Sequence, residues 1–134
     1  MILKKLLAYL SLTIICTGAQ AEWARVGAGD NYTTYVDTAS LRKNNNIVKI
    51  WTLDDFKTAK SRLTPGLDLK TYFSSTHLLE FDCKEEYFNI LYSLLYEQPM
   101  AKGEIIDSDN VPSKSPVVPG SVGELIFGLA CGNR

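Results

Sequence analysis

Apolar and polar side chains alternate along much of the chain, which is the pattern of β-strands with one buried face. The clearest case is Lys70–Cys83, where every second residue from Phe73 onward belongs to one face. That face contains Phe73, Ser75, His77, Leu79, Phe81 and Cys83. Segments rich in β-branched and aromatic residues predict further strands at Trp23–Gly27, Tyr32–Val36, Ile47–Phe56, Glu86–Glu97 and Gly103–Ile106.

Four segments are predicted on different grounds. Asp37–Arg42 predicts a single capped helical turn, because an Asp precedes a short run of helix-compatible residues. We predict loops for Ala59–Leu69, which contains Pro-Gly, and for Ser108–Pro119, which contains three prolines. Glu86–Glu97 is apolar on both faces, so a helix is the alternative to a central strand there.

A C-terminal helix is predicted from Ser121 to Cys131. Ser121 and Glu124 form an S-x-x-E capping box, and Gly132 is a natural stop. The apolar stripe of this helix consists of Val122, Leu125, Ile126 and Leu129. Cys131 lies off that stripe, so the helix has to roll or unwind in its last turn if Cys131 faces a sheet.

These elements predict an α+β fold. We expect a single antiparallel sheet of about six strands in sequence order, with the C-terminal helix packed on one face. Cys83 lies on the apolar face of its strand, where a packed helix can be tethered to the sheet.

The first residues have the three parts of a secretory signal. Lys4 and Lys5 precede an apolar stretch, and Ala19-Gln20-Ala21 is a cleavage pattern. We therefore assign residues 1–21 to a signal peptide and residues 22–134 to one mature domain. The alternatives are an uncleaved anchor and a lipoprotein acylated at Cys16.

Charge and cysteine content narrow the class of protein. The formal net charge of −1 becomes −3 when Lys4 and Lys5 are removed, which gives no attraction for nucleic acid. After cleavage no apolar segment is long enough to be a stable transmembrane segment. Cys83 and Cys131 are then the two remaining cysteines, and outside the cytoplasm such a pair is normally oxidised. The alternatives are a metal pair and a redox pair, although the chain has no C-x-x-C.

Candidate chemistry is sparse. His77 is the sole histidine and is interpreted as a buried or half-buried structural residue. Asp54-Asp55 and Glu85-Glu86 are adjacent pairs, and neighbours on a strand point to opposite faces, so neither pair forms a carboxylate dyad. No nucleophile–base pair, phosphate-binding loop or metal motif is found, so we expect no catalytic residues, no cofactor and no metal site.

Two clusters are candidate binding surfaces, and each also has an interpretation that involves no binding. Tyr72, Tyr87, Tyr92 and Tyr96, together with Trp51, form either a partner patch or ordinary sheet packing. Lys57, Lys60 and Arg62 form either a patch for acidic partners or a solvated loop.

Several short motifs resemble the bacterial surface-adhesin protein E family. They are Tyr35-Val36-Asp37 with Ser40-Leu41, Trp51, Tyr72-Phe73-Ser74-Ser75, Glu80-Phe81-Asp82-Cys83, Gly103-Glu104, Pro119-Gly120-Ser121 and Ala130-Cys131. The resemblance covers about Trp23 to Cys131. It implies an antiparallel sheet with a C-terminal helix tethered by a Cys83–Cys131 bridge. It also implies a non-enzymatic, adhesin-like protein that binds host extracellular-matrix or serum proteins. No segment carries binding residues over, so ligand-binding residues stay unassigned.

The function hypothesis is therefore an exported binding protein located in the periplasm, at the outer-membrane surface or in the medium. A periplasmic or envelope accessory module with an unknown ligand or protein partner is the alternative, and a hydrolytic enzyme is disfavoured. Neither the ligand nor the oligomeric state follows from the residues.

We predict that the exported protein begins at Glu22, because cleavage is expected after Ala21. N-terminal sequencing of protein recovered after export checks this. A lipid-modified N-terminus at Cys16 would instead support the lipoprotein alternative.

Overall fold

The computed structural model describes residues 21–132. Most of the expected signal peptide, including Cys16, lies outside the described residues. The strands are β1 (Trp23–Ala28), β2 (Tyr32–Asn44), β3 (Ile47–Leu63), β4 (Leu69–Asp82), β5 (Tyr87–Gln98), β6 (Lys102–Asp109) and β7 (Ser113–Pro116). A short 3-10 turn η1 (Pro99–Ala101) precedes β6, and the helix α1 (Val122–Cys131) follows β7.

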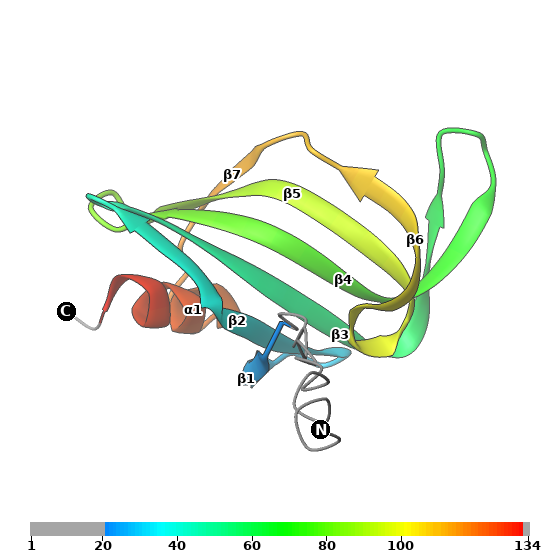
Figure 1. Cartoon of the computed structure of the whole chain (residues 1–134), viewed down its shortest axis with the longest axis horizontal. Coiled ribbons are helices and arrows are strands. Elements are labelled where there is room, and N and C mark those ends of the chain that lie inside the picture. Colours follow the sequence, from blue (N-terminus) through cyan, green and yellow to red (C-terminus); the bar gives the residue numbers. More distant parts are fainter. Residues whose placement is uncertain (1–20, 133–134) are drawn as a thin grey trace, which may run out of the picture.

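The strands form one antiparallel sheet in the order β1-β2-β3-β4-β5-β6, with β7 also paired to β5. This confirms the predicted fold class and the sequence-neighbour order. Figure 1 shows the curved sheet with α1 against one of its faces, and the β3–β4 hairpin projecting away from the helix. The segment predicted at Glu86–Glu97 forms the strand β5, so the alternative of a helix there is wrong.

Three local predictions need correction. Asp37–Arg42 is not a helical turn, because β2 continues through it with an irregular register against β3. The polar side chains instead fill the irregularity: Ser40 Oγ donates to the Asp37 carbonyl at 2.6 Å and accepts the Trp51 amide at 2.9 Å. A hydroxyl thus satisfies backbone groups that the displaced ladder leaves unpaired.

Both predicted loops contain strand. β3 extends to Leu63 and β4 starts at Leu69, so the segment expected as a loop is a long hairpin. Ser113–Pro116 pairs with β5, although it contains a proline and lies in the segment expected as a surface loop. Proline is compatible with an edge strand, where one side of the backbone has no ladder partner.

The helix begins as predicted. Ser121 is its N-cap, and its Oγ accepts the Glu124 amide at 3.2 Å. The Glu124 carboxylate reaches back to the Gly120 amide at 2.6 Å, one residue earlier than in a standard capping box.

The buried face of α1 differs from the predicted stripe. Ile126, Phe127 and Ala130 are buried, whereas Leu125 and Leu129 are 53% and 43% exposed. The helix remains regular to Cys131 and has rolled, because the last residue must face the sheet to meet Cys83. β1 approaches the rolled helix closely: a Cβ on Gly27 would lie 3.1 Å from Leu125 Cδ1.

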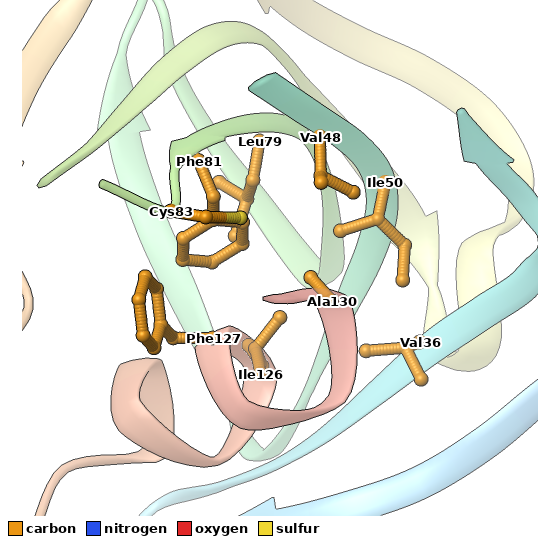
Figure 2. Packing of buried hydrophobic residues seen from close by; sticks show 9 residues of the cluster. All are labelled: Val36, Val48, Ile50, Leu79, Phe81, Cys83, Ile126, Phe127 and Ala130. Atoms are coloured by element: carbon orange, nitrogen blue, oxygen red, sulfur yellow. The ribbon is translucent and has the colours of Figure 1, made fainter. Parts of the chain in front are cut away.

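The core lies between α1 and one face of the sheet. Figure 2 shows its members, which are Val36, Val48, Ile50, Leu79, Phe81, Cys83, Ile126, Phe127 and Ala130. The Phe81 and Phe127 rings meet edge-on with centroids 5.9 Å apart. We call this side of the sheet the inner face and the opposite side the outer face.

Cys83 and Cys131 are bonded, with their Cα atoms 5.5 Å apart. The predicted disulfide is therefore present, and it tethers the end of α1 to the end of β4. The bridge links residues 48 apart in sequence. Closing a loop of that length restricts the unfolded chain by about 4 kcal/mol in the chain-entropy account.

We predict that reduction of Cys83–Cys131 loosens α1 before it affects the sheet, because a ten-residue helix is marginal without tertiary packing. Hydrogen exchange of the oxidised and reduced protein checks this. Faster exchange should start in residues 122–131 while β3 and β4 stay protected. Equal loss of protection in helix and sheet would contradict it.

Candidate functional site

The outer face carries a row of large side chains in its centre. Trp51 of β3 pairs with Leu78 of β4, and Leu78 pairs with Tyr92 of β5. Directly paired residues on antiparallel strands project from the same face, so the three side chains lie side by side. The Trp51 and Tyr92 rings meet edge-on, with centroids 6.4 Å apart and an interplanar angle of 86°. We call Trp51, Leu78 and Tyr92 the outer-face row.

All three members of the row are half-buried. Helix α1 packs on the inner face and therefore covers none of them. Large aromatic surface left accessible on one face of a sheet is characteristic of a protein-binding region, whereas the same residues inside a two-layer fold would be fully buried.

Polar side chains border the row toward the β2–β3 and β4–β5 turns. Lys49 Nζ lies 3.8 Å from a Glu80 carboxylate oxygen, and Asn89 donates weakly to the same carboxylate at 3.5 Å. An apolar centre with a solvated polar margin is the usual layout of a protein–protein interface.

On the other side the row is bounded by η1. Met100 N donates to Asp55 Oδ1 at 2.8 Å, and Ala101 N donates to Ser74 Oγ at 2.9 Å. Met100 and Ala101 both have positive φ, and these two hydrogen bonds hold them in that conformation. η1 thus limits the accessible area to the middle of the outer face.

The structure brings together part of the predicted aromatic cluster. Tyr96 lies near the row, and its hydroxyl is 3.4 Å from Thr76 Oγ1. Tyr72 packs instead against Phe56 at 5.6 Å on the projecting hairpin. Tyr87 lies at the start of β5, where Lys114 Nζ is 4.6 Å from its ring centre. Leu78 was missed in sequence, because its role depends on the strand register.

Two members of the basic cluster have partners within the chain. Arg62 Nε lies 2.9 Å from Asp107 Oδ2, and the Arg62 guanidinium also approaches Asp109 at 3.9 Å. Lys60 Nζ lies 4.8 Å from the centre of the Phe56 ring. The two Arg62 contacts join the projecting hairpin to β6 and pair the Arg62 charge with carboxylates, whereas the Lys60 contact stays within β3.

The inner face beyond α1 carries a polar network centred on His77. Its Nδ1 is 2.8 Å from Ser93 Oγ, and its Nε2 is 3.0 Å from Ser75 Oγ and 3.7 Å from Asp54 Oδ2. Thr34 Oγ1 donates to the other Asp54 oxygen at 2.6 Å. His77 is therefore a hydrogen-bonded inner-face residue, as its alternation predicts.

A small cavity of about 190 Å³ lies next to this network. It is lined by the polar residues Thr34, Asp54 and His77 and by apolar residues that include Phe81 and Ile126. Asp54 and Asp55 project to opposite faces, so they form no dyad, as predicted. Sequence reasoning missed the Asp54–His77 approach, because it links two strands.

The serine–histidine contacts were also not expected, since no nucleophile–base pair was found in sequence. Burial lowers the pKa of His77, and the Asp54 carboxylate only partly opposes this. Both ring nitrogens are engaged by serine hydroxyls, and Asp54 approaches the same nitrogen as Ser75. In a hydrolase triad a carboxylate is hydrogen-bonded to the ring nitrogen opposite the nucleophile. Here the nitrogen opposite Ser93 is hydrogen-bonded to Ser75, and Asp54 lies 3.7 Å away, beyond hydrogen-bond distance, so the arrangement differs from that geometry. Among residues 21–132 no group of three or more His, Cys, Asp or Glu side chains is placed to hold a metal ion.

We predict that the network makes folding pH-dependent. The pKa of His77 lies below its ordinary value of 6.5, so the unfolded chain binds the proton more tightly than the folded protein. The stabilisation from neutral His77 is complete above that value and is lost as the pH falls toward the folded pKa. Urea unfolding across this range should show a decline on acidification that is smaller in His77→Gln. An NMR titration midpoint of His77 at or above the ordinary value would contradict this.

The chain is similar to a known protein family in sequence and to solved structures in fold. A sequence profile described as surface-adhesin protein E matches residues 23–132. The selenomethionine form of Haemophilus influenzae protein E superposes with a TM-score of 0.65 at 15% identity, covering 87% of this chain and 91% of that one. Crystal form II of the same protein gives a TM-score of 0.64 at 14% identity, covering 86% and 91%.

No curated protein sequence matches the chain significantly. Within residues 21–132, α1 is too short and no other helix is long and apolar enough to cross a bilayer. The profile match spans most of the sequence and includes both bonded cysteines. The chain belongs to the surface-adhesin protein E family.

Proposed function

We propose that this chain is an exported, non-enzymatic adhesin that binds a host extracellular-matrix or serum protein through the outer-face row. Family membership supports adhesion as the general role. The observation that carries the proposal is the edge-on Trp51–Tyr92 contact on a sheet face that α1 does not cover.

The row has the chemistry of an interface centre. Tryptophan and tyrosine are the residues most often found at energetic hot spots, because they bury large areas and lose little side-chain entropy. Leu78 lies between them in the strand register and provides apolar surface without a polar group to desolvate. The Lys49–Glu80 pair at the margin stays solvated and contributes mainly to orientation of a partner.

The surface is also rigid before binding. Trp51, Leu78 and Tyr92 belong to three adjacent, hydrogen-bonded strands, so their backbones need no ordering when a partner arrives. A preorganised sheet face suits a folded domain of a matrix or serum protein better than a small molecule, which requires a concave site.

Export is part of the proposal. The signal-like residues 1–21 and the Cys83–Cys131 bridge both suit a compartment outside the cytoplasm. Labelling of intact cells with a membrane-impermeant reagent separates surface display from the alternative of a periplasmic accessory module. Labelling only after the outer membrane is opened would favour that alternative.

We predict that Trp51→Ala and Tyr92→Ala each weaken binding to immobilised matrix or serum proteins. A hot-spot side chain contributes about 2 kcal/mol or more, which corresponds to roughly thirtyfold in Kd. Tyr87→Ala is the matched control, since Tyr87 is an exposed aromatic of the same sheet outside the row. Surface plasmon resonance with thermally verified variants checks this. Equal losses for all three variants would show that the row is not the binding site.

A further inference from the structure

The tip of the β3–β4 hairpin exposes a cluster of leucines that the adhesin proposal does not use. Leu63, Leu67 and Leu69 are 57%, 78% and 71% exposed. Leu63 and Leu69 are cross-strand partners, so their side chains lie next to each other. Leucine is among the residues most often buried, and three exposed leucines within seven positions form a patch rather than scattered exceptions. We call residues 63–69 the hairpin tip.

One of these leucines occupies a backbone conformation that disfavours it. Leu67 has φ of 62°, in the left-handed region where glycine and asparagine are usual and a bulky side chain is strained. With 78% of its surface exposed, the Leu67 side chain packs little against the rest of the chain. A glycine would satisfy this turn better. Strain combined with exposure indicates that the side chain serves a contact outside the chain.

The tip is held in shape before any contact. Leu67 N donates to the Thr64 carbonyl at 2.8 Å, and the Asp68 carbonyl accepts both the Thr64 amide at 2.9 Å and its hydroxyl at 3.1 Å. Below the tip, Arg62 is ion-paired with Asp107 of β6. A preorganised tip loses little conformational entropy on docking.

Basic residues follow directly behind the leucines. Arg62 and Lys70 are cross-strand partners adjacent to Leu63 and Leu69, and Lys60 is two residues further along β3. Asp68 is the one carboxylate within the tip. At about 3.3 Å per residue, Lys60 lies roughly 10 Å behind Leu63, which matches the depth of the headgroup layer that apolar side chains cross.

We propose that the hairpin tip is a membrane-contact site that inserts Leu63, Leu67 and Leu69 into the interface of an anionic phospholipid bilayer. Lysine ammonium groups at headgroup level attract anionic lipid while the leucines enter the acyl boundary. Figure 1 shows the hairpin projecting away from α1 and from the main body of the sheet, so the tip can contact a surface without the rest of the sheet.

A protein partner fits the tip less well. Stable protein interfaces bury about 800 Å² on each side, and a narrow seven-residue tip offers only a small convex area. A bilayer needs no complementary cavity. The contact is independent of the outer-face row, and the two sites are tested separately.

The test uses exported protein whose mass shows removal of residues 1–21, because a retained apolar leader would bind lipid by itself. Co-sedimentation is measured with vesicles of phosphatidylcholine and phosphatidylglycerol, and with phosphatidylcholine alone. The native protein should bind the anionic vesicles more strongly, with binding weakened by salt.

Leu67→Gly is the decisive variant. It should weaken vesicle binding about tenfold, because this is the fold-change that corresponds to the free energy of moving one leucine side chain out of water. Its melting temperature should equal or exceed that of the native protein, because glycine relieves the strain. Lys60→Gln with Lys70→Gln should reduce the preference for anionic vesicles on the order of tenfold.

Val111→Ser is the matched control, since Val111 is 72% exposed in the segment between β6 and β7. It should bind vesicles like the native protein. Failure of the native protein to sediment with anionic vesicles would overturn the proposal. So would equal binding by Leu67→Gly, or equal weakening by Val111→Ser.

Discussion

One short helix has to bury the apolar side of a seven-stranded sheet, and this constraint organises the molecule. Ten residues of α-helix span about 15 Å, whereas a strand as long as β3 spans more than three times that length. α1 therefore covers only one part of the inner face. The disulfide from Cys131 to Cys83 fixes which part is covered, at the end of β4 where Phe81 meets Phe127.

The polar residues of the uncovered inner face are explained by the short length of α1. Apolar residues there would remain in contact with water, and the sheet instead carries Thr34, Asp54 and His77. Because the site is still partly buried, these groups need partners, and the hydroxyls of Ser75 and Ser93 provide them. The network that resembles catalytic machinery by residue type is thus explained as the polar continuation of a core that α1 cannot reach.

The sequence predicted what depends on local pattern and missed what depends on register. Alternation located the strands, and Ser121 with Glu124 located the start of α1, because both signals lie within a few residues. The rotation of the helix was missed, since the disulfide decides it from outside the helix. Leu78 and the Asp54–His77 approach were missed for the same reason: each depends on which residues of neighbouring strands stand opposite.

Exposed apolar residues in this fold have two different physical origins. Trp51 and Tyr92 are accessible because α1 packs on the other face and η1 covers only one end of the outer face, and their strand conformation is unstrained. Leu67 is accessible on a hairpin that could have ended in glycine, and its positive φ disfavours a leucine. The architecture accounts for the exposure of the first pair but not for that of Leu67. A side chain that neither packs nor suits its backbone is therefore stronger evidence for an external contact than an aromatic residue on an open sheet.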